Sequence, residues 1–217
     1  MCIVIQIKCK NKPTDRSLAA IEKLNSEYYY LDKDVNGVPN SDGLILLHSK
    51  NDSIKVDPIQ IEQLDLTPNW ERDTFPYEVF NFPNLKSLYV GMRSFEILPS
   101  EISKLKHLES IDLQNSNLKY LPKNIGNLSE LREIVLLGSN VETLPISICE
   151  LQKLKRLQLG NSKVKLLPEC IKNLSQLEEI IIGVEDVSLS LELKRQIIRL
   201  KTEMPNCKFV TSEDYMN

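Results

Sequence analysis

The feature that most constrains this sequence is an internal repeat. The pair Leu-Pro recurs with a constant period of 23 in the residue numbering, and it stands at Leu98-Pro99, Leu121-Pro122, Leu144-Pro145 and Leu167-Pro168. Apolar residues recur in the same way between these pairs, for example in the column Ile102, Ile125, Ile148 and Ile171. A fixed period of about 20–50 residues is typical of solenoids, in which each repeat packs only on its neighbours.

Each repeat contains two different periodicities. The stretch Leu108-x-x-Ile111-x-Leu113 ends with alternating apolar residues, which predict a short strand that buries one face. The stretch from Pro99 to Leu108 has an apolar residue at every third position, which predicts a 3₁₀-like or loosely helical return. A bundle of amphipathic helices is excluded because a proline would lie inside every helix. The sequence therefore predicts an α/β solenoid with a parallel sheet on one side.

The repeat resembles the leucine-rich-repeat family, whose unit reads LxxLxLxxNxLxxLPxxIxx, and is similar to its plant intracellular Ras-group and Scribble-type members. The resemblance covers about residues 59–187. It implies a curved parallel sheet on the concave side and 3₁₀ or helical returns on the convex side. In the family, a buried Asn column binds the backbone between turns. Serine, which can give one hydroxyl bond per turn, occupies three of the six positions in the corresponding column here: Asn69, Arg93, Ser116, Ser139, Ser162 and Glu185.

Both ends of the array are expected to carry caps, because a terminal repeat would otherwise expose its apolar face. We expect an N-terminal capping region at residues 1–58, repeats with about six strands at 59–187, and a C-terminal cap at 188–217. In the first region, residues 3–9 and 44–48 are expected to be strands, the second of them as a degenerate first turn, and a helix is expected to follow Thr14. In the last region, a helix ends before Pro205, and residues 204–210 resemble the closing strand of bacterial family members; the apolar stripe of that helix is Leu193, Ile197, Leu200 and Met204.

Composition excludes several classes of function. The formal net charge is −3, from 27 basic and 30 acidic residues, so the attraction that drives phosphate binding is missing and nucleic acid is not an expected partner. No apolar run approaches the roughly 18 residues of a membrane span. The five cysteines are scattered without a CxxC pair, which favours reduced thiols over a disulfide framework or a zinc cluster. We therefore expect a cytoplasmic protein, although one whose export signal had been removed would look the same.

No catalytic site, cofactor site or metal site is predicted. The two histidines, His48 and His107, stand at no ligand or triad spacing, and the seven glycines form no phosphate-binding loop. One stretch, Asp32-x-Asp34-x-Asn36-Gly37, has the opening spacing of a calcium loop, but its twelfth position is Gly43 instead of a glutamate. A surface loop between two strands is the preferred interpretation, and calcium binding is left as an alternative.

The residues predicted to face outward from the strands form the candidate binding face. Several are apolar at positions expected to be solvent-exposed, and apolar patches framed by charges are typical of protein interfaces. A neighbouring column rich in glycine, including Gly91 and Gly160, is expected to leave room for a partner's backbone. The candidate binding residues are Tyr89, Asp112, Glu133, Val135, Leu137, Arg156, Gln158, Glu179 and Ile181.

These observations favour a non-enzymatic module that binds another protein on the concave face, as a monomer or weak homodimer and without a cofactor. Two alternatives remain open. The first is a structural or adhesive repeat protein of the cell envelope, and the second is the regulatory portion of a larger enzyme system. The ranking rests on analogy between folds, and a fold by itself does not determine a function.

Overall fold

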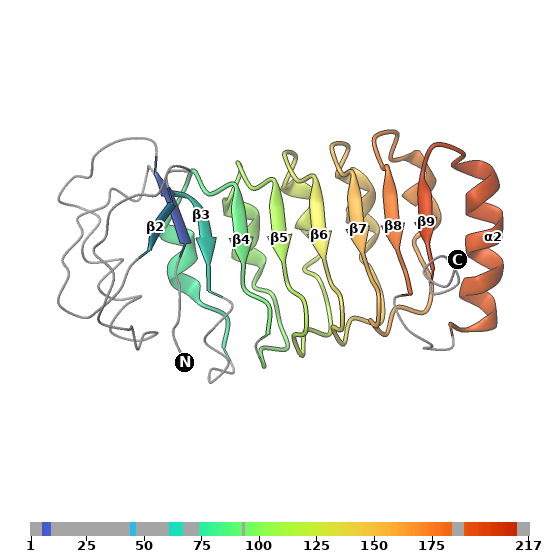
Figure 1. The fold of residues 1–217 in the computed structure, drawn as a ribbon, viewed down its shortest axis with the longest axis horizontal. Coiled ribbons are helices and arrows are strands. Elements are labelled where there is room, and N and C mark those ends of the chain that lie inside the picture. The colour runs from blue at the N-terminus through green and yellow to red at the C-terminus, as the bar shows by residue number, and fades with distance from the viewer. Residues whose placement is uncertain are drawn as a thin grey trace.

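A computed structural model describes residues 6–9, 44–46, 61–66, 74–92, 94–183 and 189–211. These residues form a solenoid with a sheet on one side and short 3₁₀ turns behind it (Figure 1). Within them the sheet has nine strands in the order β2-β1-β3-β4-β5-β6-β7-β8-β9, and β3 to β9 are parallel. The predicted α/β solenoid is therefore confirmed.

The repeats supply one strand and one 3₁₀ turn each. Register partners such as Leu88, Ile111 and Ile134 are separated by one sequence period, so the period sets the pairing. The parallel strands are β3 (Ile61–Asp65), β4 (Ser87–Tyr89), β5 (Ser110–Asp112), β6 (Glu133–Val135), β7 (Arg156–Gln158), β8 (Glu179–Ile181) and β9 (Lys208–Val210). The 3₁₀ turns are η3 (Tyr77–Asn81), η4 (Ser100–Lys104), η5 (Ile125–Asn127), η6 (Ile146–Glu150) and η7 (Glu169–Asn173).

A Leu-Pro pair directly precedes three of the described 3₁₀ turns, η4, η6 and η7. Pro99 precedes η4 with an extended backbone, and its carbonyl accepts a hydrogen bond from the N–H of Ile102 at 3.1 Å. Pro145 and Ile148 make the same contact at 3.0 Å in η6. Proline fits here because this position needs an extended φ and an acceptor, and no N–H donor. The preceding leucine, such as Leu98, is buried in the core.

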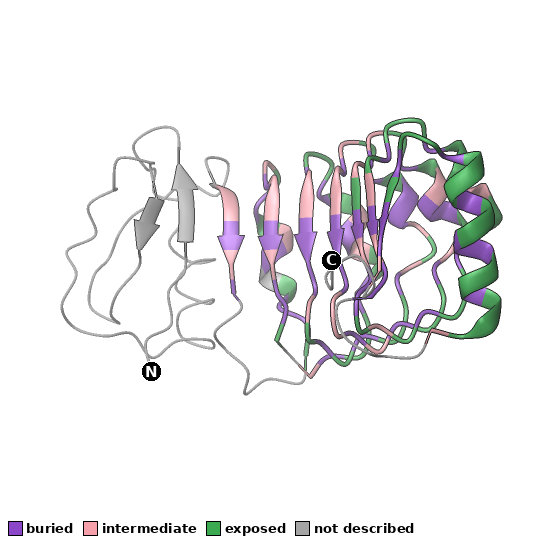
Figure 2. Ribbon diagram, turned by 45° about the vertical axis from the view of Figure 1, so that its right-hand side comes forward, coloured by how far each residue is buried: buried purple, intermediate pink, exposed green. Residues whose placement is uncertain are grey.

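The core lies between the sheet and the 3₁₀ turns and runs without interruption along the array (Figure 2). Every described apolar column that the sequence pattern assigned to the interior from Leu85 to Leu177 is buried. The inward residue at the centre of each strand is fully covered, as in Leu88, Ile111, Ile134, Leu157 and Ile180. One repeat could not cover these side chains alone, so burial depends on the neighbouring repeats.

A column of left-handed residues follows the strands. Met92, Asn115, Gly138 and Asn161 have φ between 50° and 63° and are spaced by the same sequence period. This conformation suits glycine and is tolerated by asparagine, whereas other residues adopt it at a cost of roughly 1–2 kcal/mol. Met92 bears that cost, which the sequence pattern did not reveal.

The serine column contributes less to stacking than expected. Ser116 Oγ donates to the carbonyl of Leu113 in its own turn at 2.7 Å, which confirms one hydroxyl bond there. Ser139 is buried, but its Oγ has no hydrogen-bond partner among the described residues. The turns are joined instead by main-chain bonds, such as that from Leu113 N–H to Val135 O at 2.9 Å. Asn69, Arg93 and Glu185 lie outside the described residues.

The strand predictions near the N-terminus are confirmed for β1 (Gln6–Cys9) and β2 (Leu44–Leu46). The interpretation of residues 44–48 as a degenerate first repeat is wrong, because β2 pairs antiparallel with β1, and β1 separates it from β3. An edge strand held this way extends the sheet without adding a repeat. The helix expected after Thr14, the calcium-loop candidate at Asp32–Gly43 and His48 lie outside the described residues.

The predicted C-terminal helix is α2 (Leu191–Glu203), which follows the N-cap residue Ser190 and ends before Met204. Ser190 Oγ accepts a hydrogen bond from the N–H of Leu193 at 3.1 Å, as an N-cap residue does. Leu193, Ile197 and Leu200 are buried in the core, which confirms the predicted apolar stripe. The chain then enters β9, which continues the parallel sheet beside β8.

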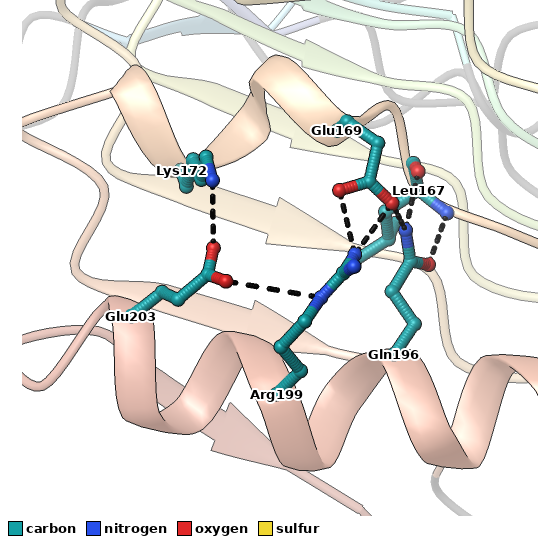
Figure 3. Close-up of polar contacts among 6 residues, drawn as sticks. All are labelled: Leu167, Glu169, Lys172, Gln196, Arg199 and Glu203. Carbon is teal, nitrogen blue, oxygen red and sulfur yellow. Dashed lines mark hydrogen bonds and ion pairs between the residues drawn. The ribbon is translucent and has the colours of Figure 1, made fainter.

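A buried side chain of α2 completes the backbone bonding of the last repeat (Figure 3). Gln196 Oε1 accepts from the N–H of Leu167 at 2.8 Å, and Gln196 Nε2 donates to the Leu167 carbonyl at 2.8 Å. In earlier repeats, the residues before the Leu-Pro pair bridge from one turn to the next, at Ile97, Tyr120 and Thr143. The Gln196 amide therefore stands where the backbone of a further repeat would bind.

Replacing Gln196 with methionine should destabilise the protein by roughly 2–4 kcal/mol, because a buried N–H and a buried carbonyl of Leu167 would lose their partners. Chemical denaturation followed by circular dichroism measures the change. Lys194→Met, at an exposed position of the same helix, is the matched control and should change stability by less than about 0.5 kcal/mol. Equal effects of the two substitutions would contradict the capping role of Gln196.

Two cysteines on neighbouring 3₁₀ turns form a disulfide. Cys149 in η6 and Cys170 in η7 are bonded, with their Cα atoms 5.8 Å apart and a sequence separation of 21. The expectation that all cysteines are reduced thiols is therefore wrong for this pair. Cys207 is buried, and burial together with Glu179 raises the pKa of its thiol to about 11. A thiol with so high a pKa is a poor nucleophile at neutral pH.

Removal of the disulfide by the double substitution Cys149→Ser and Cys170→Ser should lower stability by about 3 kcal/mol, because a loop of this length is no longer closed in the unfolded chain. Thermal unfolding under non-reducing conditions measures the loss. A reductant should lower the Tm of the parent protein and leave that of the double variant unchanged. A reductant-independent Tm in the parent would contradict the cross-link.

Candidate protein-binding face

The outward-facing side chains of the strands form two rows across the sheet. Register pairs each residue with the equivalent residue of the next strand, and neighbouring strands lie about 4.8 Å apart. Row one contains Asp65, Tyr89, Asp112, Val135, Gln158, Ile181 and Val210. Row two contains Gln63, Ser87, Ser110, Glu133, Arg156, Glu179 and Lys208.

The structure brings the predicted binding residues together on this sheet face. Eight of the nine lie in rows one and two, and Leu137 follows Val135 by two residues. Their exposure differs from expectation at Val135, which is only 8% exposed instead of solvent-accessible. Asp112 is likewise only 9% exposed. Arg156 is exposed, and the partly buried members are Tyr89, Glu133, Leu137, Gln158, Glu179 and Ile181.

The glycine column does not leave room for a partner's backbone at Gly91. A Cβ atom built there would lie 2.6 Å from the carbonyl oxygen of Gln114, so the backbone of the next repeat already fills the space. Gly160 and Gly183 are buried as well. Glycine at Gly91 is therefore explained by close packing between repeats, and the expectation from sequence is wrong there.

Charged side chains of row two are paired from strand to strand. Glu133 accepts hydrogen bonds from Arg156 Nε at 3.0 Å and from Gln158 Nε2 at 2.9 Å. Glu179 and Lys208 form a looser pair at 3.8 Å. The hydrogen bond from Arg156 to Glu133 and their attraction raise the pKa of Arg156. These solvated pairs contribute little free energy, but they hold the side chains in place on the face.

The N-terminal part of the face is acidic around one aromatic ring. We call Asp65, Tyr89, Asp112 and Glu133 the acidic corner. Burial raises the pKa of Tyr89, and the charges of Glu133, Asp112 and Asp65 raise it further. Burial also raises the pKa of Asp112, and Asp65 and Glu133 add to this effect; the N–H of Gln114, which donates to Asp112 Oδ1 at 2.9 Å, opposes it.

Six members of the two rows were not among the candidate binding residues, namely Gln63, Asp65, Ser87, Ser110, Lys208 and Val210. Lys208 follows Glu179 by more than one sequence period, because α2 is inserted before β9, so the period could not place it. No cluster of three metal-ligating side chains occurs among the residues that the structure describes. His107 is exposed.

Comparison with known proteins identifies the family. A family model for the leucine-rich repeat region matches residues 81–202, which is more than half of the chain. The chain belongs to the leucine-rich-repeat family. No functionally curated protein shows significant similarity to it.

Two solved structures of leucine-rich-repeat proteins share the fold. One is a leucine-rich-repeat protein of Leptospira interrogans, with 30% identity and a TM-score of 0.60, matched over 68% of this chain and 36% of its own. The other is the ectodomain of the Arabidopsis thaliana membrane receptor kinase GASSHO1/SCHENGEN3, solved in complex with Casparian strip integrity factor 2. It has 29% identity and a TM-score of 0.53, over 57% of this chain and 16% of its own. This chain therefore spans about a third or less of either structure.

Among the described residues, none of the helices is both long and apolar enough to cross a membrane.

Replacing Asp112 with asparagine should raise the Tm at neutral pH. The folded-state pKa of Asp112 is raised, so the folded state favours the neutral acid. The folded protein therefore loses stability as the pH rises from the ordinary pKa of aspartate through the higher pKa of Asp112 in the fold. Asparagine stays neutral and keeps an oxygen for the Gln114 N–H. The gain should disappear as pH falls toward about 3, where aspartate is itself protonated.

Thermal unfolding between about pH 3 and pH 7 tests this expectation. Glu142→Gln is the matched control, because a hydrogen bond from Lys165 lowers the pKa of Glu142 and the substitution should give no gain at neutral pH. A lower Tm for Asp112→Asn at neutral pH would show that the carboxylate stabilises the fold.

Proposed function

We propose that the chain is a non-enzymatic protein-interaction module that binds its partner on the sheet face. The observation that carries the proposal is the combination of partly buried apolar side chains, Leu137 and Ile181, with charged side chains held in place around them. Interfaces of this kind have an apolar centre and a polar rim. The family supports the same function, since leucine-rich repeats are protein-interaction modules in general.

The physical properties of the array suit such a role. Strand pairing and a continuous core join the repeats, so the face is formed before a partner arrives. A preformed surface loses little conformational entropy on binding, which leaves more of the contact energy for affinity. The receptor ectodomain among the similar structures was solved in complex with Casparian strip integrity factor 2. That complex is an example of a related array that holds a partner.

A second candidate, a structural or adhesive protein outside the cytoplasm, is favoured by one observation. The bond between Cys149 and Cys170 would persist in an oxidising compartment and would be reduced in most cytoplasms. The cytoplasmic location expected from sequence relied in part on reduced thiols. We therefore propose an oxidising compartment as the site of action, which fractionation of cells of the source organism would test.

The double substitution Leu137→Asp and Ile181→Asp should remove partner binding and leave the fold intact, because neither side chain belongs to the hydrophobic core. Val135 is left unchanged, since an aspartate there would be buried beside Asp112. Affinity capture from a lysate of the source organism, followed by mass spectrometry, compares the proteins retained by each variant. Circular dichroism checks that the fold is preserved.

Ile146→Asp is the matched control, because Ile146 is 79% exposed and lies on η6, on the opposite side of the solenoid. It should retain the same proteins as the parent chain. Recovery of an identical set with the double variant would contradict binding on the sheet face. Loss of binding in the control instead would point to the 3₁₀ side.

A further inference from the structure

We propose that the acidic corner binds a lysine or arginine side chain of the protein partner, and that Leu137 and Ile181 contact apolar residues of the same segment. This proposal rests on the proposed function, because it names the chemistry of the partner that the sheet face would bind. The partner segment is thus cationic at one end and apolar at the other.

The first argument is the arrangement of the corner within row one. Asp65, Tyr89 and Asp112 are register partners on three adjacent strands, β3, β4 and β5. Because neighbouring strands lie about 4.8 Å apart, the tyrosine stands between two carboxylates. An aromatic ring attracts a cation through its face, and a carboxylate attracts it through charge-assisted hydrogen bonds. Tyr89 and Asp112 therefore offer one cation both kinds of contact.

The second argument is the state of Asp112. This side chain is 9% exposed, and Oδ1 accepts the hydrogen bond that the structure gives it, from the N–H of Gln114 at 2.9 Å. No cation pairs with it within the described part of the chain, while Glu133, its neighbour in the corner, is held by Arg156. A buried carboxylate without a counter-ion lowers stability. A cation supplied by a partner would complete the pair.

Two described basic side chains at or beside these strands, Lys86 and Arg156, are already paired with acidic groups. Lys86 Nζ lies 3.3 Å from Glu62 Oε2, and Arg156 Nε donates a hydrogen bond to Glu133 Oε1. An ammonium or guanidinium group fits the corner better than a metal ion, because the described residues hold no cluster of three metal-ligating side chains. Both groups are monovalent donors and match one buried carboxylate and one ring.

The third argument sets the spacing of the partner's residues. Asp112 and Ile181 lie in row one on strands that are three positions apart, since β6 and β7 stand between β5 and β8. Three strand spacings are about 14 Å, and an extended chain covers this distance in about four residues. We therefore expect a basic residue and an apolar residue separated by about four positions in an extended partner segment.

A random dodecapeptide library displayed on phage, selected against the intact chain, tests this chemistry without knowledge of the natural partner. The selected sequences should be enriched in lysine or arginine, with an apolar residue about four positions away. Synthetic peptides from the selection are then measured by fluorescence anisotropy. Their affinity should fall as ionic strength rises, because a charge pair contributes to binding.

Asp112→Asn should lower the affinity for the selected peptides by on the order of 30-fold, because the peptide's cation would lose its counter-charge. Tyr89→Phe should bind within about twofold of the parent chain, since the ring is retained, and Tyr89→Leu should bind roughly fivefold more weakly. Glu142→Gln removes the same charge from an exposed position away from the strands and should leave the affinity unchanged. This control separates the corner from a general effect of net charge.

The outcomes distinguish this proposal from the function on which it rests. Selected peptides without basic residues that still lose affinity to Leu137→Asp with Ile181→Asp would overturn the cation site and leave binding on the sheet face standing. Peptides that bind the double variant and Asp112→Asn as tightly as they bind the parent chain would overturn both proposals. A selection that yields no basic peptide at all also overturns the cation site.

Discussion

The structure depends on the main-chain ladder that joins each repeat to the next. Bonds such as that from Leu113 N–H to Val135 O, at 2.9 Å, hold neighbouring turns at the spacing of strands in a sheet. All residues in one column therefore meet nearly the same surroundings. This constraint explains the buried columns, the proline at the start of the 3₁₀ turns, and the left-handed residues after the strands. It also explains why Gly126 tolerates no side chain, since a Cβ there would clash with the Ser147 carbonyl of the next turn.

Features that share the sequence period could be predicted from sequence, and features that break it could not. The strands, the returns and the core could be predicted because the residue pattern of each one recurs in every repeat. The disulfide was missed because Cys149 and Cys170 have a sequence separation of 21 and occupy different columns. They meet because one lies near the end of η6 and the other near the start of η7. Gln196 was missed for a similar reason, since its role depends on how α2 packs on Leu167.

The candidate face also combines features that the sequence predicts with features that it does not. Alternation along each strand predicted which residues point outward, and the register confirms that they share one surface. Alternation could not predict how far each one is covered, because neighbours across the ladder decide that. Val135 and Asp112 are shielded for this reason, although they belong to the outward row. A residue can therefore face the binding side of a solenoid and still be unsuitable as a site for an exposed-surface mutation.

The distribution of charge along the face has a consequence for how a partner is oriented. Acidic groups gather around Tyr89 near β3 to β6, whereas Arg156 and Lys208 lie farther along, on β7 and β9, beside their acidic partners. Apolar side chains such as Ile181 stand toward this second end. A partner with one cationic end and one apolar end would gain contacts in one direction along the array and lose them in the other. Because the repeats are fixed by strand pairing, the face cannot adapt to the reversed orientation, and like-charge contacts would penalise it. The repeat thus supplies rigidity, and the residues that differ between repeats supply direction.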